Sequence, residues 1–144
     1  MVKKVKSVVK EEVKVESAFM KLLKDPNRFQ RLEDGWVRDK LVGVEWGPTS
    51  KGGMTFKEAQ EYCAKLGARL PEVEELMSIA VRTKHDPSID TDVFPDTKAS
   101  WYWTRTQHAR WNDCAWCVVF YNGSVGNSYK GNGIYVRPVR ASQA

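Results

Sequence analysis

Residues 110–117, RWNDCAWC, combine two sets of side chains that could do chemistry. Asn112 and Asp113 offer carboxamide and carboxylate oxygens, and calcium takes about six to eight such ligands. Cys114 and Cys117 have the Cys-x-x-Cys spacing of zinc sites and thiol redox centres. Both interpretations need further partners, which must come from the rest of the chain.

Those partners are scarce in the sequence. A calcium site would need a second oxygen-rich stretch, and the chain has no Glu-Pro-Asn or Gln-Pro-Asp tripeptide. Tetrahedral zinc takes four ligands, and only Cys63, His85 and His108 remain to complete the set. In an extended strand, residues three apart point to opposite faces, which disfavours a direct pairing of the two cysteines. We therefore expect no metal, no cofactor and no catalytic residue, and a thiol or metal enzyme is the less favoured alternative.

The composition predicts a single domain with a basic start. The chain has 144 residues, 42% of them hydrophobic, which is enough for one packed core. The net charge is +5, and the first ten residues alone hold four lysines and no acid. We therefore expect a basic tail and no nucleic-acid partner. We also expect no membrane span and no secretory signal, and the sequence leaves the localisation open.

Residues 1–27 are predicted to be an appendage. Val5, Val9 and Val13 have helical spacing, although the alternation of Val with Lys and Glu equally suits a strand. Ser17 is placed to cap a short helix. This segment could act as an oligomerisation arm or as an unstructured leader, and the sequence does not choose between them.

Residues 28–144 are predicted to form one α+β domain. Alternating apolar residues after an Asp-Gly pair indicate short strands at 33–47. Thr55 and Glu58 form a capping box that opens a helix, with Cys63 on its apolar face. A second helix is predicted from the stretch RLPEVEELMSIAVRT. An irregular loop and then a twisted antiparallel β unit follow, the latter with four Trp within sixteen positions.

Seven stretches coincide, in order, with the pattern of one family. The chain resembles the Lcl-type C-terminal domain over about residues 28–140, through RFQRLEDGWVRDKLVGVEW, EAQEYCAKLG, RLPEVEEL, DPSIDTDVFPDT, YWTRT, AWCVVFYNGSV and YVRPVR. The resemblance implies a C-type-lectin-like fold, with two helices packed on a small twisted antiparallel sheet and a long irregular loop region. It implies ligand binding without catalysis.

The resemblance also implies a mechanism of variation. Some domains of this kind are variable proteins of diversity-generating retroelements, in which mutagenesis directed at adenines rewrites chosen codons near the C-terminus. In this chain such a variable region would cover about 100–140, with an unknown protein or glycan as the ligand. The expected ligand-binding positions lie between the pattern-matching ones: Arg105, His108, Arg110, Trp111, Asn112, Asp113, Cys114, Cys117, Val119, Tyr121, Ser124, Gly126, Asn127, Ser128, Tyr129, Gly131 and Gly133.

Strand geometry gives an independent expectation for the centre of this region. Trp116, Val118 and Phe120 share one face of a strand and are predicted to be core. Cys117, Val119 and Tyr121 share the opposite face, which is predicted to be partly exposed. An ordinary Lcl-type binding domain with a fixed adhesive or structural role is the alternative. Related formylglycine-generating enzymes share the fold and use paired cysteines, and they represent the enzymatic alternative.

Overall fold

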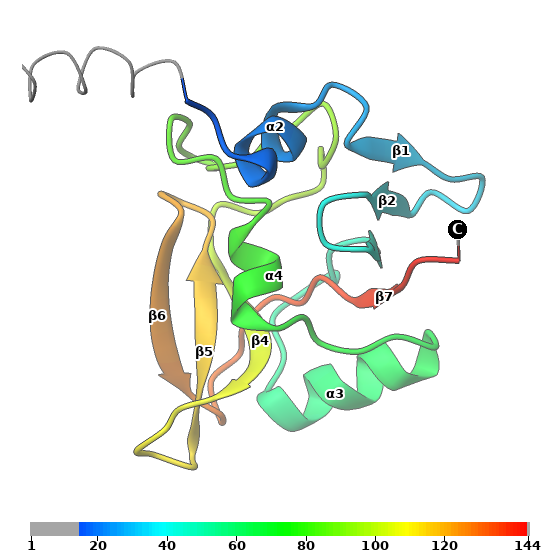
Figure 1. Ribbon diagram of the computed structural model, residues 1–144. Coiled ribbons are helices and arrows are strands. Elements are labelled where there is room, and N and C mark those ends of the chain that lie inside the picture. Colours follow the sequence, from blue (N-terminus) through cyan, green and yellow to red (C-terminus); the bar gives the residue numbers. More distant parts are fainter. Residues whose placement is uncertain (1–14, 144) are drawn as a thin grey trace, which may run out of the picture.

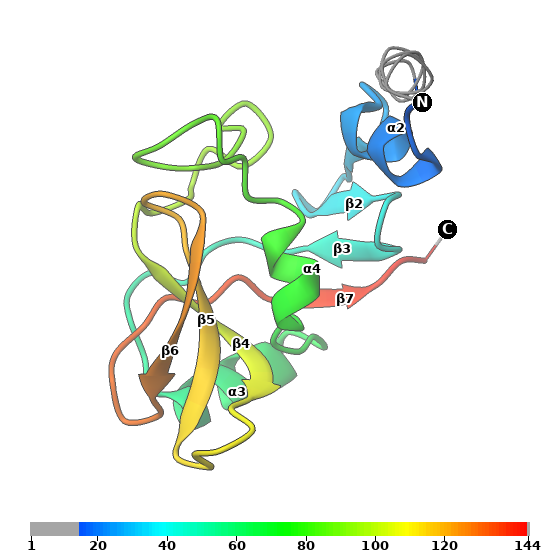
Figure 2. The ribbon, with the colours of Figure 1, turned by 60° about the vertical axis from the view of Figure 1, so that its left-hand side comes forward.

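The computed structural model describes residues 15–143, which form an α+β structure with three helices and two antiparallel sheets. Both sheets and the helix α4 (Val73–Met77) between them are visible in Figures 1 and 2. Of the predicted appendage, residues 1–14 lie outside the described part. The helix α2 (Ala18–Lys24) begins where Ser17 was predicted to cap it, and the Ser17 hydroxyl accepts a hydrogen bond from the amide of Met20.

The four-stranded sheet joins the two ends of the domain. Its order is β1-β2-β3-β7, and every neighbouring pair is antiparallel. These strands are β1 (Phe29–Arg31), β2 (Val37–Asp39), β3 (Val44–Trp46) and β7 (Val139–Ala141). Because β7 pairs with β3, the last strand closes the sheet that the first strands begin.

A buried ion pair fixes this sheet. Arg28 donates from Nε and Nη2 to the two carboxylate oxygens of Asp39, at 2.9 and 3.0 Å. The indole of Trp46 and the amide of Leu41 donate to the same carboxylate. With four donors, Asp39 is satisfied although it is fully buried, which is the condition for a buried charge to be tolerated.

The three-stranded sheet carries the predicted variable region. Its order is β4-β5-β6, again antiparallel throughout. The strands are β4 (Trp101–Gln107), β5 (Cys114–Val119) and β6 (Ser124–Tyr129). The register of β4 against β5 shifts between Trp103 and Gln107, which is a bulge-like irregularity just before the hairpin.

Two apolar clusters lie on the two sides of this sheet. The larger one joins Tyr102 and Val118 to α4 and to the four-stranded sheet. The smaller one joins Trp103, Ala115 and Cys117 to the helix α3 (Phe56–Lys65). Because both of its sides are covered, β5 is buried on both faces over much of its length.

The helix α3 follows the predicted pattern. Thr55 Oγ1 accepts from the amide of Glu58, and Glu58 accepts from the amide of Thr55, so the capping box is confirmed. Gly67 has a φ of 67°, the left-handed conformation that ends helices and that glycine adopts without strain. Cys63 is fully buried, as predicted.

The irregular stretch at 84–100 is anchored by a buried arginine. Arg137 donates to the carbonyl of Gly47, to Asp96 at 2.9 Å and to the hydroxyl of Thr97 at 2.7 Å. Its guanidinium also lies over the ring of Phe94. The segment just before β7 (Val139–Ala141) therefore holds the loop, which explains how a long segment without regular structure stays packed.

Two features differ from the sequence prediction. The chain has two sheets where one small sheet was predicted, because the strands at 29–46 pair with β7 and not with β4, β5 or β6. The second helix is only five residues long. It ends at Ser78, whose hydroxyl donates to the carbonyl of Glu75, and the amide of Val81 bonds instead to Ser88 in the irregular loop.

Candidate binding surface

The strand β5 places its side chains differently from the prediction. Cys117 is fully buried, with Trp103 opposite it on β4, whereas Trp116 is only half-buried. The prediction that Trp116 is core and that Cys117 and Val119 face a partly exposed surface is therefore wrong, since Val119 is buried as well. The physical reason is that α3 covers the Ala115–Cys117 side, whereas α4 covers Val118 but leaves Trp116, two residues nearer the hairpin, without a helix over it.

One end of the three-stranded sheet forms a protruding surface, which we call the hairpin end (residues 107–114 and 129–133). It lies at the bottom of the molecule in Figure 1. Lys130 ties its two parts together, because its ammonium donates at 2.6 Å to both the Gln107 side chain and the carbonyl of Asn112. The amide of Lys130 also donates to the carbonyl of Asp113 at 2.8 Å. The loop is therefore crosslinked to the neighbouring turn and not free.

A stack of rings stiffens the same hairpin. His108 lies between Trp111 and Trp116, with ring centroids 4.6 and 5.1 Å away and planes within 28° of parallel. The guanidinium of Arg110 lies 5.3 Å from the centroid of Trp111. His108 Nδ1 accepts from the amides of Arg110 and Trp111, at 3.0 and 3.3 Å. Trp111 remains 48% exposed, so the stack presents aromatic surface to solvent.

An open pocket of about 450 Å³, which we call the aromatic pocket, lies beside this end. Its lining has no charged residue and consists of Ser100, Trp101, Asn127, Ser128, Tyr129, Asn132, Gly133, Ile134 and Tyr135. The Trp101 ring packs directly on β6 at Gly126, where an added Cβ would come within 2.8 Å of the ring. Aromatic faces beside amides and hydroxyls are the surface chemistry of sites for small or extended ligands.

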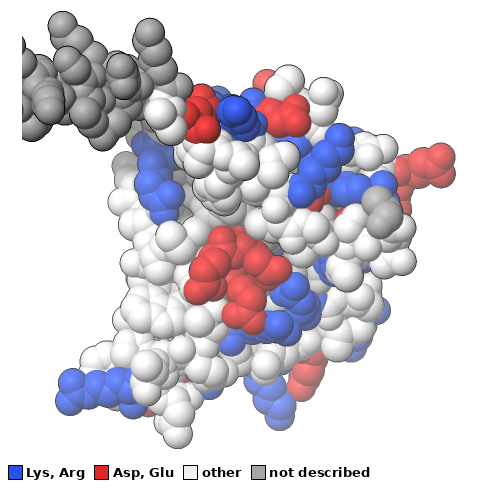
Figure 3. All heavy atoms as spheres, in the orientation of Figure 1, with Lys and Arg blue, Asp and Glu red and all other residues white. Residues whose placement is uncertain are grey.

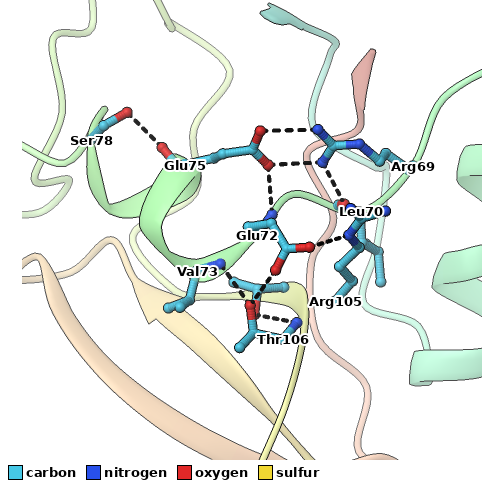
Figure 4. Close-up of polar contacts among 9 residues, drawn as sticks. Arg69, Leu70, Glu72, Val73, Glu75, Ser78, Arg105 and Thr106 are labelled. Atoms are coloured by element: carbon cyan, nitrogen blue, oxygen red, sulfur yellow. Dashed lines mark hydrogen bonds and ion pairs between the residues drawn. The ribbon is translucent and has the colours of Figure 1, made fainter. Parts of the chain in front are cut away.

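Arg105 belongs to a separate polar network around the start of α4 (Figure 4). It forms an ion pair with Glu72, whose other carboxylate oxygen accepts from the hydroxyl of Thr106 at 2.9 Å. The hydrogen bond from Arg105 is the largest cause that lowers the pKa of Glu72. Glu75 accepts from both Nη atoms of Arg69 and from the amide of Glu72. This network fixes α4 against β4.

The structure divides the predicted ligand-binding positions by exposure. The exposed ones are Arg105, Arg110, Trp111, Asn112, Asp113, Tyr121, Ser124, Tyr129, Gly131 and Gly133. The half-buried ones are His108, Cys114, Gly126 and Asn127. The buried ones are Cys117, Val119 and Ser128. Of these, Ser128 lines the aromatic pocket, whereas Cys117 and Val119 are not available to a ligand in this structure.

The exposed positions fall into three groups, one of which is Arg105 alone in the polar network at the start of α4. In the register of β5 against β6, Cys114 pairs with Tyr129 at one end and Val119 with Ser124 at the other. Most candidates gather at the hairpin end or at the aromatic pocket next to it. Tyr121 and Ser124 lie at the opposite end of the strands, so the structure does not bring them together with the rest.

Sequence reasoning missed several residues of this surface. Trp101 and Tyr135 line the aromatic pocket, and Lys130 holds the hairpin, yet all of them match the family pattern or precede it and were not considered as binding residues. Trp101 gave one usable signal. It stands at the start of the aromatic cluster, and alternation places it on the same strand face as Trp103. The structure buries Trp103 fully and leaves Trp101, at the end of that face, exposed.

The pKa of each cysteine thiol is raised, so the thiols are protonated near neutral pH. Burial raises the pKa of Cys63 and of Cys117 to about 12. Partial burial and the neighbouring Asp113 carboxylate raise the pKa of Cys114. An activated nucleophile needs the opposite shift. Among residues 15–143, no three His, Cys, Asp or Glu side chains gather in a group that could hold a metal ion.

Together these features define an α+β domain with a rigid, aromatic-rich and basic end that projects beyond its core. The chain belongs to the Lcl C-terminal domain family, whose model matches residues 35–140. A search of curated proteins found no match. In the part of the chain that the structure describes, no helix combines the length and apolar character required to cross a membrane.

Proposed function

We propose that this protein is a non-catalytic ligand-binding domain whose binding surface is the hairpin end together with the aromatic pocket. The observation that carries this proposal is the layering of the C-terminal strands. Buried residues such as Tyr102, Trp103 and Val118 form a continuous scaffold. Exposed polar and aromatic side chains project from the loops of the hairpin end and from the edge strand β6. A scaffold that is already ordered lowers the entropic cost of binding.

The side chains at this surface suit protein or glycan partners. Trp111 and Tyr129 are about half exposed, at 48% and 57%, and such aromatic groups give large contact areas at low conformational cost. Arg110 lies at the tip of the hairpin and adds a cation that is already oriented over Trp111. The stack and the Lys130 hydrogen bonds hold these groups in place before a ligand binds. Binding therefore does not have to order the loop, which would weaken the affinity.

We further propose that the fold is C-type-lectin-like and that the surface is diversified by a retroelement. The supporting observation is that fourteen of the seventeen predicted variable positions are exposed or half-buried, where a substitution leaves the packed core intact. The exceptions, Cys117, Val119 and Ser128, are excluded from the proposed diversified surface.

The test of diversification is genomic. A near-copy of the coding region for residues 100–140 should lie close to the gene, next to a reverse transcriptase gene. Its adenines should fall at the codons of the exposed positions and not at the codon of Cys117. If no such copy exists, an ordinary Lcl-type domain with a fixed ligand is the better description, and the preformed aromatic pocket is then the feature that favours it.

The absence of catalysis is a separate part of the proposal. It is supported by the protonated state of the thiols and by the placement of Cys114 and Cys117 on opposite faces of β5. Metal analysis of the purified protein together with thiol titration tests it. A stoichiometric metal, or a thiol that reacts as a thiolate near neutral pH, would show that the domain has chemistry of its own.

A further inference from the structure

The strand β6 forms an outer edge of the three-stranded sheet, because within residues 15–143 it pairs with β5 alone. It lies along the left-hand side of the molecule in Figure 1. Its six residues pair with β5 without interruption, so the edge is regular and has no bulge. The binding surface described above lies beside this strand and gives its free edge no role.

The backbone of β5 turns toward its two neighbouring strands at alternate residues. The amide of Phe120, which follows β5, donates to the carbonyl of Ser100, which precedes β4. Successive residues of an antiparallel strand direct their amides and carbonyls to opposite sides. Val118 therefore shares its backbone direction with Phe120 and faces β4, whereas Cys117 and Val119 face β6.

The register then shows which backbone groups of β6 face outward. The partners of the β5 residues that face β6 are Ser124, Gly126 and Ser128. The alternate residues Val125, Asn127 and Tyr129 therefore direct their backbone groups to the outer edge. The carbonyl of Tyr129 accepts a hydrogen bond from the amide of Asn132. The amides of all three residues, and the carbonyls of Val125 and Asn127, have no hydrogen-bond partner in the described part of the chain.

An edge of this kind is a surface to which another strand can add. Proteins usually protect such edges with charged side chains, proline, bulges or very short strands. The edge strands of the four-stranded sheet, β1 and β7, follow this rule, since each has three residues and carries an arginine. The strand β6 has six residues, SVGNSY, without charge or proline. In Figure 3, which has the orientation of Figure 1, the surface along β6 is mainly white and therefore uncharged.

The aromatic pocket lies beside the same strand and indicates what an added strand would carry. Residues 127–129 of β6 line this pocket together with Trp101 and Tyr135. Trp101 is 39% exposed, although its ring packs on β6 at Gly126. A strand paired with β6 would place alternate side chains on the pocket side of the sheet. The uncharged and partly aromatic lining favours an apolar or aromatic side chain there.

A second copy of β6 fits this edge less well than a segment of another protein. In the antiparallel register that brings the outward-facing residues together, Asn127 stands opposite Asn127 of the copy. The residues of the copy opposite Ser128 and Tyr129 are then a glycine and a valine. Such short side chains would leave the pocket of about 450 Å³ unfilled.

We propose that the outer edge of β6 receives an extended, uncharged segment of a partner protein, which pairs with the strand through its backbone and inserts one apolar or aromatic side chain into the aromatic pocket. In complexes of this type, backbone hydrogen bonds give the affinity and the pocket gives the specificity. The occupation of the pocket rests on the proposed function, whereas the pairing along the edge rests on the backbone of β6. The ligand of this surface is then a protein and not a glycan.

The probe is a phage-displayed library of random peptides, selected on the full-length protein. The selected peptides are expected to share an uncharged stretch with a large apolar or aromatic residue. N-methylation of a peptide amide that bonds to β6 should lower the affinity about tenfold or more, whereas N-methylation of the neighbouring amides should not. This alternation along the peptide is the signature of an added strand.

Asn127→Pro tests the edge from the side of the protein. Proline has no N–H and is tolerated in an edge strand where the N–H faces outward, so the pairing of β6 with β5 should survive. The binding of the selected peptides should weaken about tenfold or more, because a donor is lost and the ring obstructs the added strand. Asn127→Ala is the matched control. It removes the side chain but keeps the amide, and it should bind within about threefold of the unchanged protein.

Amide hydrogen exchange tests the same pairing without a variant, and so decides the question even if Asn127→Pro does not fold. In the free unchanged protein, the amides of Val125, Asn127 and Tyr129 should exchange faster than those of Gly126 and Ser128. A bound peptide should slow the exchange of the first three. Bound peptides that leave these three amides unprotected would overturn the proposal.

Three further outcomes would also overturn the edge pairing. Peptides that bind folded Asn127→Pro as well as the unchanged protein, but lose affinity on Trp111→Ala, would place the ligand at the hairpin end and leave the proposed function standing. A library without any binder would overturn the edge pairing alone, since the proposed function also admits a glycan. A dimer of the unchanged protein that Asn127→Pro dissociates would show that a second copy occupies the edge.

Discussion

Replacement of Cys117 by serine is expected to destabilise the protein, although the same change at Cys114 is expected to be harmless. Cys117 is fully buried among apolar side chains, and its sulfur has one oxygen within reach, the carbonyl of Ala115 at 3.9 Å. A hydroxyl needs an acceptor within about 3.0 Å, so serine at this position would be left without a good partner. Burial of an unpartnered hydroxyl costs about 1–3 kcal/mol.

Two comparison variants separate the causes of this loss. Cys117→Ala removes the sulfur without adding a polar group, and it should cost about 1 kcal/mol, near the value of one buried methylene. Cys114→Ser changes a half-buried thiol and should stay within about 0.5 kcal/mol of the unchanged protein. The free energy of unfolding is measured by urea denaturation under reducing conditions, followed by tryptophan fluorescence. Equal stability of Cys117→Ser and Cys114→Ser would refute the assignment of Cys117 to the core.

Three further predictions concern the thiols and α4. In the native protein, a thiol reagent should modify Cys114 quickly and Cys63 and Cys117 only after denaturation, and fast reaction of all three would contradict their burial. Since burial raises the pKa of Cys63 and Cys117 from 9.0 to about 12, the stability present below pH 9 should be lost as pH rises toward 12. The slope is at most about 1.4 kcal/mol per pH unit for each thiol, and it should be shallower in a Cys63→Ala/Cys117→Ala double variant. Glu75→Ala should cost about 1–2 kcal/mol in urea denaturation, because it removes the cap of α4 and an ion pair, whereas Glu74→Ala should be neutral.

The sequence predicted those parts of the fold whose signals are local. The Thr55 capping box and the Ser17 cap are set by neighbouring residues, and both helices begin where predicted. The length of the second helix, α4, was overestimated. The reason is tertiary, since the chain beyond Ser78 bonds to a loop that is distant in sequence.

The faces of β5 could not be predicted from alternation. A strand that is covered on both sides gives no polar–apolar period, so the pattern does not say which side chain remains open. Trp116 was predicted to be core because it shares a face with Val118 and Phe120, and Cys117 was predicted to be surface because its neighbours on that face were diverse. The outcome depends on how far α4 reaches along the sheet, which is a property of the assembled fold.

The contacts that build the hairpin end could not be predicted from the sequence. The stack of His108 between Trp111 and Trp116 requires the hairpin to fold back on β5, and the Lys130 bonds join two loops. No spacing in the sequence encodes such contacts. The family resemblance predicted which region varies, and the structure shows which of its residues face outward.

The central claim is that the hairpin end is a rigid surface whose residues the fold does not dictate. The most direct measurement is protease resistance across two libraries displayed on cells. One randomises Arg110, Asn112, Asp113 and Tyr129, and the other randomises the buried residues Ala115, Cys117, Val118 and Ser128. We predict that most members of the first library remain folded and most of the second do not. Equal loss of folded protein in both libraries would contradict the claim.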